Sequence, residues 1–136
     1  METYVSETKT IYASSESIFN KLSDLSNLEK VKHMIPQDKI SDLYFDRDSC
    51  SFSVSPVGKV GIRIEEREEF KTIKFGADQS PLPFNLWIQL VEAGPTDTKM
   101  RITLKADIPF LLKPMVGGKL KDGVNKIADA LSRLPY

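Results

Sequence analysis

The chain has 136 residues, with 19 Lys or Arg and 19 Asp or Glu, so its formal net charge at pH 7 is zero. That length predicts a single domain, and the balanced, mostly scattered charge gives no electrostatic footprint for nucleic acid or an anionic membrane. One cysteine, Cys50, excludes a disulfide framework, and a zinc site would need carboxylates beside Cys50 and the single His33.

The N-terminal third predicts one strand followed by two short helices. Residues 2–13 mix β-branched and aromatic residues with polar ones, which is typical of a strand. The next segment, SSESIFNKLSDL, offers serine caps and has apolar residues at helical spacing. A second helical stretch, NLEKVKHMI, should end before Pro36, because proline lacks an N–H and its ring clashes with the preceding turn.

From Lys39 to Asp107 apolar and polar residues alternate, which indicates half-buried antiparallel strands. Six strand-like runs follow one another with short turns between them, including SPVG, ADQSPLP and EAGPTDT. One apolar face should therefore run across the whole meander and must be covered. The residues of that parity are Cys50, Phe52, Val54, Val60, Ile62, Ile64, Ile73, Phe75, Phe84, Leu86, Ile88, Leu90, Met100, Ile102, Leu104, Ala106 and Ile108.

The last 25 residues predict a long amphipathic helix that covers this face. Its expected apolar stripe consists of Val116, Leu120, Val124, Ile127, Leu131 and Leu134. Gly123 lies in the middle of the stripe, where glycine costs roughly 1 kcal/mol relative to alanine. Two interpretations stand side by side: Gly123 leaves room above the sheet, or close helix–sheet packing requires a small residue there.

The chain as a whole resembles the START-like (SRPBCC) superfamily, which includes polyketide cyclase-like and Bet v 1-like proteins. The opening TKTIYASSESIFNKLSDLSNL is similar to that superfamily's strand and helix, and KADIPFLLKPMVGGKLKDGVNKIADAL is similar to its strand–proline–helix ending. The resemblance implies an α+β helix-grip fold over residues 1–136. In it, a curved antiparallel sheet of about seven strands, in the order β-α-α-β6-α, wraps around the long C-terminal helix.

In this superfamily the space between sheet and helix commonly holds a hydrophobic molecule. We therefore expect a ligand cavity lined by Phe52, Val54, Ile62, Ile64, Phe75, Leu86, Ile88, Met100, Ile102, Leu104, Val116, Leu120, Gly123 and Ile127. Possible polar lining comes from Tyr12, Asp42, Tyr44 and Gln89. The last three lie on the opposite strand parity and would enter only through a bulge. Trp87 shares that parity and is expected to face outward.

The inward parity of the alternating strands carries no Asp, Glu, His or Lys, and no common catalytic motif occurs. We therefore expect binding of a hydrophobic or amphipathic, lipid- or polyketide-like molecule without chemistry, with no catalytic residue, metal or cofactor. One alternative is a polyketide cyclase- or dehydratase-type enzyme that uses the polar candidates. Another is a protein-binding module that uses the outer face or Trp87.

The expected location is the cytoplasm. The N-terminal residues METYVSETKT contain no apolar signal core, and no stretch approaches the roughly 18 apolar residues of a membrane span. The single cysteine fits a reducing compartment. The expected partner is a hydrophobic small molecule, with a protein partner as a possibility and with neither nucleic acid nor integral membrane association.

Overall fold

The computed structural model describes residues 2–34, 40–54, 58–78 and 83–136. The described residues form, in chain order, β1 (Glu2–Val5), β2 (Lys9–Ile11), α1 (Ser15–Leu22), the 3-10 helix η1 (Leu25–Met34), β3 (Ile40–Phe45), β4 (Ser49–Val54), β5 (Gly58–Glu68), β6 (Thr72–Ala77), β7 (Phe84–Gly94), β8 (Asp97–Ala106), the 3-10 turn η2 (Phe110–Leu112) and α2 (Lys113–Ser132). This order confirms the predicted helix-grip fold.

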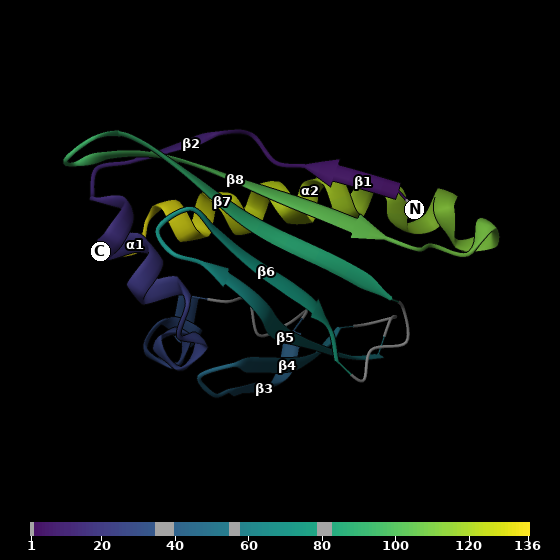
Figure 1. Cartoon of the computed structure of the whole chain (residues 1–136). Coiled ribbons are helices and arrows are strands. Elements are labelled where there is room, and N and C mark those ends of the chain that lie inside the picture. The colour runs from purple at the N-terminus through teal and green to yellow at the C-terminus, as the bar shows by residue number, and fades with distance from the viewer. Residues whose placement is uncertain (1, 35–39, 55–57, 79–82) are drawn as a thin grey trace.

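The strands form a single antiparallel sheet in the order β1-β8-β7-β6-β5-β4-β3, and β2 also pairs with β8. The sheet is curved and open, with β1 and β2 at one edge and β3 at the other (Figure 1). Neighbouring strands from β3 to β8 follow one another in sequence, as expected for a meander joined by short turns.

The segment predicted as one strand, residues 2–13, is divided into β1 and β2. At the division Ser6 still pairs with β8: its N–H donates to the Ile102 carbonyl at 2.8 Å, and its hydroxyl accepts from the Ile102 N–H at 2.9 Å. The next N–H, that of Glu7, donates to Asn125 Oδ1 on α2 at 2.8 Å. The backbone therefore leaves the sheet ladder at Glu7 because the helix supplies its partner.

Helix α1 begins where the sequence predicts. The Ser14 hydroxyl accepts from the Ser17 N–H at 3.1 Å and caps the first turn. Ile18, Phe19 and Leu22 are buried on one side of the helix, which packs against β6 and β7. The second predicted helical stretch is present as η1, a 3-10 rather than an α-helix.

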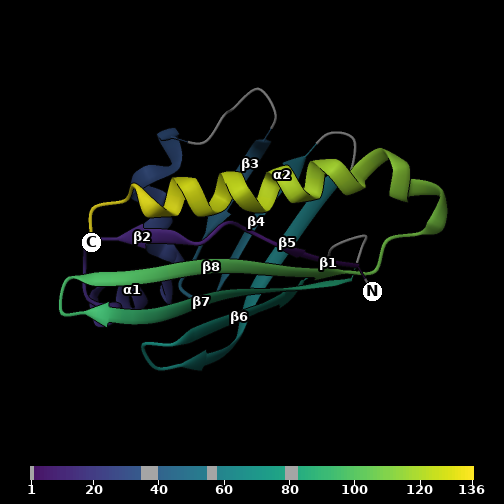
Figure 2. The same cartoon turned by 90° about the horizontal axis from the view of Figure 1, so that it is seen from above.

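Helix α2 packs against β8, β1 and β2 and runs alongside them (Figure 2). Its buried side contains Val124 and Ala128, and Leu134, just beyond the end of the helix, is also buried. Ile127, which the sequence places in the apolar stripe, is 44% exposed. The helix is fastened to the β1–β2 edge, where Lys121 Nζ donates to the Val5 carbonyl and Asn125 accepts from Glu7. Compared with the predicted stripe, α2 is therefore rotated about its own axis, so that Ala128 packs against the sheet and Ile127 is turned outward.

The hydrophobic core lies between the sheet and the two α-helices. Its fully buried side chains include Ile18, Ile73, Met100, Ile102 and Val124. Phe19 and Phe70 add an edge-to-face contact with ring centroids 5.7 Å apart. Among the described residues, no helix combines the length and apolar character needed to cross a membrane.

Candidate functional site

The inward face of the sheet carries the apolar residues that the alternation predicts. Of the expected lining residues, Ile64, Phe75, Ile88, Met100, Ile102 and Leu104 are buried, and Phe52, Ile62, Leu86 and Leu120 are half-buried against the same core. The side chains of Val54 and Val116 lie outside the described residues. The half-buried lining residues keep part of their apolar surface exposed, so they are the ones that a ligand could contact.

Apart from Leu120, which is on α2, these half-buried residues lie on strands that are not among those against which α2 packs. We call Phe45, Phe52, Ile62, Phe84 and Leu86 the inner wall; they are half-buried and pack on the core. Strand register places them on one face, since Phe45 pairs with buried Cys50, Cys50 with Ile62, and Phe84 with buried Ala106. Helix α2 instead packs against β1, β2 and β8. The inner wall is therefore an apolar surface only partly covered.

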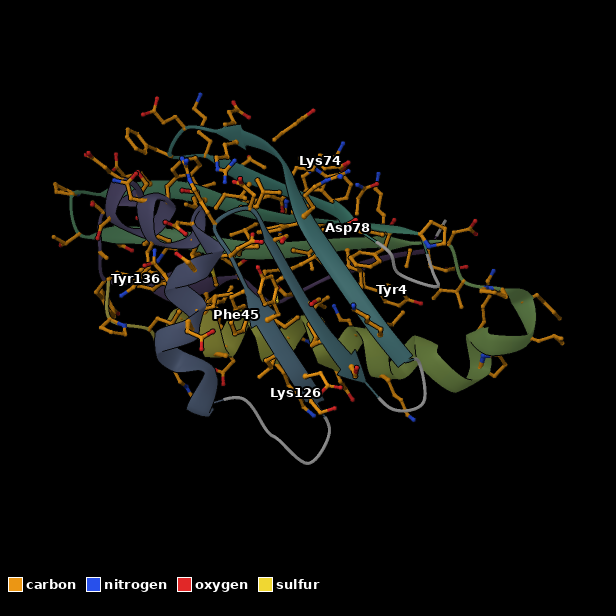
Figure 3. The ribbon with its side chains drawn as sticks, turned by 90° about the horizontal axis from the view of Figure 1, so that it is seen from below. Tyr4, Phe45, Lys74, Asp78, Lys126 and Tyr136 are labelled. Atoms are coloured by element: carbon orange, nitrogen blue, oxygen red, sulfur yellow. The ribbon has the colours of Figure 1, made fainter. Side chains whose placement is uncertain are left out.

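Tyr4 adds a polar group to this inward face that sequence analysis did not identify. It pairs with Leu104 in the β1–β8 ladder, so its ring lies on the inward side, where it is half-buried (Figure 3). Lys74, which pairs with Trp87, lies on the outer face. The inward orientation of Tyr4 depends on its pairing with a strand a hundred residues later, and the short edge strand β1 gives little alternation from which to predict it.

Gly123 faces open space. A Cβ built on Gly123 would meet no atom within 4 Å, so close packing does not require glycine there. At about 100° per residue, Gly123 and Ile127 share one flank of α2, and Lys121 and Asn125, which bind the β1–β2 edge, share the other. The flank of Gly123 therefore faces away from the β1–β2 edge.

At two other glycines, Gly61 and Gly76, a Cβ would clash with a neighbouring group. A Cβ on Gly61 would lie 2.0 Å from the Asp78 carbonyl oxygen, and the Asp78 N–H donates to the Gly61 carbonyl at 2.9 Å. A Cβ on Gly76 would lie 2.5 Å from the Glu65 carboxylate. These two positions are glycine because neighbours occupy the space, whereas Gly123 is glycine beside open space.

The four polar candidates do not come together in one pocket. Tyr12 is 84% exposed at the end of β2, and Tyr44 is 58% exposed on β3. A bulge does occur in β3 between Ser41 and Tyr44, with Asp42 at a φ of 55°, but Asp42 is also exposed. Its carboxylate accepts a bond of 3.3 Å from the Ser53 hydroxyl.

Gln89 lies on the other side of the sheet, where its carbonyl oxygen accepts from Arg101 Nε at 3.1 Å and from the Thr103 hydroxyl at 2.9 Å. The β6–β7–β8 register is regular through this region, so no bulge turns Gln89 or Trp87 inward. Gln89 is therefore separated by the sheet from the inner wall. The expected polar lining does not form a catalytic group.

The outer face carries a shallow hollow of about 340 Å³ around the single tryptophan. Its lining consists of Val5, Trp87, Gln89, Arg101, Thr103 and Lys105. The ammonium groups of Lys74 and Lys105 lie 5.7 and 5.6 Å from the centre of the Trp87 ring. These distances fit cation–π contacts, which account for an outward tryptophan by packing within the sheet surface.

Cys50 is buried, and its thiol is expected to be unreactive. Burial, together with the negative charge of Asp46, raises the pKa of the Cys50 thiol to about 12. The thiol is therefore protonated at neutral pH and is a poor nucleophile or metal ligand. Across the ranges that the structure describes, no group of three or more His, Cys, Asp and Glu side chains is placed to hold a metal ion.

The fold is shared with solved structures of low sequence identity. A START superfamily protein from Mycobacterium smegmatis aligns over 98% of this chain and 99% of its own, with 15% identity and a TM-score of 0.63. Norcoclaurine synthase from Thalictrum flavum, in complex with dopamine and hydroxybenzaldehyde, aligns over 97% of this chain and 86% of its own, with 13% identity and a TM-score of 0.72.

A protein from Thermobifida fusca aligns over 100% of this chain and 97% of its own, with 14% identity and a TM-score of 0.64. No protein-family model matches the chain, and no curated protein sequence matches it. At these identities the likeness establishes a START-like helix-grip fold, which confirms the resemblance noted from the sequence, and leaves function to be argued from the residues.

Proposed function

We propose that the protein binds a hydrophobic or amphipathic small molecule between the inner wall and α2, without transforming it. The observation that carries this proposal is the inner wall, whose five apolar side chains stay half-buried on the core side of the sheet. We take the open space beside Gly123, on the flank of α2 away from the β1–β2 edge, as part of the same site. Apolar surface left partly exposed on a sheet favours an apolar occupant, because covering it removes that surface from water.

The ligand class follows from the chemistry of the surface. The inner wall offers three phenylalanine rings and two aliphatic side chains, and Tyr4 places a phenol on the same face. No protein hydrogen bond to the Tyr4 hydroxyl occurs within the described residues. The surface therefore suits a molecule that is mostly apolar and carries one or a few polar groups. Norcoclaurine synthase was solved in complex with two small aromatic molecules, dopamine and hydroxybenzaldehyde, which supports a small-molecule ligand by analogy of fold.

Leucine at Gly123, compared with leucine at Gly118, tests this proposal. A Cβ on either glycine meets nothing within 4 Å, so both substitutions fit the folded chain at the first carbon, but Gly118 is exposed near the start of the helix. Affinity for the fluorescent apolar probe anilinonaphthalene sulfonate is measured by titration. Native mass spectrometry of the purified protein is recorded in parallel to detect co-purified molecules.

We expect Gly123→Leu to weaken probe binding by about tenfold or more, because its side chain would occupy space of the size of several buried methylene groups. Gly118→Leu should leave probe binding unchanged. Equal binding by the wild type and both variants would place the probe elsewhere and overturn the proposal. An equal loss in both variants would do so as well, because a general change in α2 would then explain it.

A cyclase- or dehydratase-type enzyme is the second function that the fold permits, since norcoclaurine synthase shares it. The scatter of Tyr12, Asp42, Tyr44 and Gln89 over two faces and an edge of the sheet counts against an enzyme built on those residues. Tyr4 is the polar residue that an enzyme at this site would use first. A cytoplasmic location remains our proposal and is supported by the single buried thiol of Cys50.

A further inference from the structure

The connection between β8 and α2 exposes two large apolar side chains next to each other. Phe110 is 81% exposed and Leu111 is 83% exposed, in the 3-10 turn that follows Pro109. We call residues 109–111 the apolar tip. Figures 1 and 2 both show this turn and the first turn of α2 lying beyond the end of the sheet. An exposed, contiguous apolar group of this kind marks a contact site rather than ordinary surface.

The shape of the tip fits a fluid apolar phase better than a folded partner surface. Both side chains are more than 80% exposed, and their turn lies beyond the end of the sheet, so they can enter a bilayer while the sheet stays outside. The local backbone tolerates this, because Pro109 has no N–H and the Phe110 carbonyl accepts from the Lys113 N–H. Fewer unpaired backbone groups lower the cost of entering the interface.

The balanced total charge of the chain conceals a local excess around the tip. Residues 105–121 contain four lysines and one aspartate, an excess of three positive charges. Lys113 pairs with the Glu2 carboxylate at 2.8 Å, whereas Lys105, Lys119 and Lys121 have no ion pair among the described residues. Lys105 lies over the Trp87 ring and Lys121 donates to the Val5 carbonyl, and neither contact neutralises the ammonium charge. Exposed apolar side chains near lysines that lack a carboxylate partner suit an anionic lipid surface, which attracts the lysines and receives the apolar groups.

We infer that the apolar tip inserts into an anionic lipid surface. The domain is then held at that surface by the segment that precedes the N-terminus of α2. This contact uses none of the inner-wall side chains, so its failure and the failure of the proposed ligand site can be told apart by experiment. Contact with a lipid surface would bring the proposed ligand site at the inner wall close to the membrane, where hydrophobic molecules accumulate.

Flotation with lipid vesicles tests the inference on the full chain. Vesicles of phosphatidylcholine alone are compared with vesicles that also contain phosphatidylglycerol. The wild type should bind the anionic vesicles, and Phe110→Ser with Leu111→Ser should lower the partition constant by about tenfold or more, since two apolar side chains no longer leave water. Lys119→Gln should lower binding to anionic vesicles by roughly fivefold and leave binding to neutral vesicles unchanged.

The matched control is Val91→Ser. Val91 is 66% exposed and pairs with Lys99, at the far end of β8 from the tip, so its loss should not change vesicle binding. Insertion is read directly from Phe110→Trp in a Trp87→Phe background, whose emission should shift to the blue and be quenched by brominated lipid. Wild-type protein that does not float with anionic vesicles, or a double serine variant that binds as well as wild type, overturns the inference. A concentration-dependent dimer that the serine variant abolishes, with no vesicle binding, assigns the tip to self-association instead and also overturns it.

Discussion

Gly123→Ala should stabilise the protein. In the interior of a helix, alanine is favoured over glycine by about 1 kcal/mol, because glycine loses more backbone freedom on folding. The substituted Cβ meets nothing within 4 Å, so no steric penalty opposes this gain. We therefore expect the free energy of unfolding to rise by about 1 kcal/mol and the Tm to rise by roughly 3–5 °C for a domain of this size.

Urea denaturation followed by circular dichroism measures this change, with the slope of free energy against urea unchanged. Gly118→Ala is the matched control: it has the same open surroundings and should give a gain of similar sign. Gly61→Ala is the opposite control, because its Cβ would lie 2.0 Å from the Asp78 carbonyl oxygen and should destabilise the domain by roughly 1–3 kcal/mol. A loss of stability in Gly123→Ala would mean that a neighbour occupies the space, and the argument for an open site there would fail.

Three further outcomes follow from the buried and hydrogen-bonded groups. The Cys50 thiol should resist alkylation in the folded protein up to moderately alkaline pH, because its pKa is raised to about 12, and should react at once in urea; rapid native reaction would contradict its burial. Tyr136→Phe should cost about 1 kcal/mol in urea unfolding, since the Tyr136 hydroxyl donates to the Leu131 carbonyl at 2.5 Å, and no loss would show that this bond contributes nothing. The pKa of Asp46 should lie below its ordinary value, chiefly because the Ser49 hydroxyl donates to its carboxylate. The contribution of Asp46 to folding stability is therefore present above the unfolded pKa and is lost as pH falls through the folded pKa. Carboxyl NMR titration of wild type and Ser49→Ala checks the sign of the shift.

The strands could be predicted from the sequence because one face of a meander must be apolar. Cys50, Ile64, Phe75 and Met100 all lie on the buried side that their alternation indicates. The outward side of Trp87 follows from the same rule, and the regular β6–β7 register bears it out. Alternation is a local signal, so it indicates the buried face of a strand without any knowledge of which strands pair.

Features that depend on distant partners could not be predicted in this way. Residues 2–13 read as one strand, but the Glu7 N–H turns to Asn125, a partner 118 positions along the chain. The parity of Tyr4 is fixed only by its pairing with Leu104. Similarly, the alternation allowed a bulge to bring polar residues inward, and a bulge occurs at Asp42, yet Asp42 and Tyr44 remain exposed.

The openness of the candidate site has its cause at the opposite edge of the sheet. Two polar contacts, from Lys121 to the Val5 carbonyl and from the Glu7 N–H to Asn125, fasten α2 over β1 and β2. The small side chain of Ala128 is fully buried at this contact, whereas Ile127 is 44% exposed and Gly123 has open space beside it. Had Ile127 packed into the sheet as the stripe predicted, the helix would lie more centrally and cover the inner wall itself. The orientation of α2 that exposes Ile127, contrary to the predicted stripe, therefore also leaves the inner wall partly uncovered for a ligand.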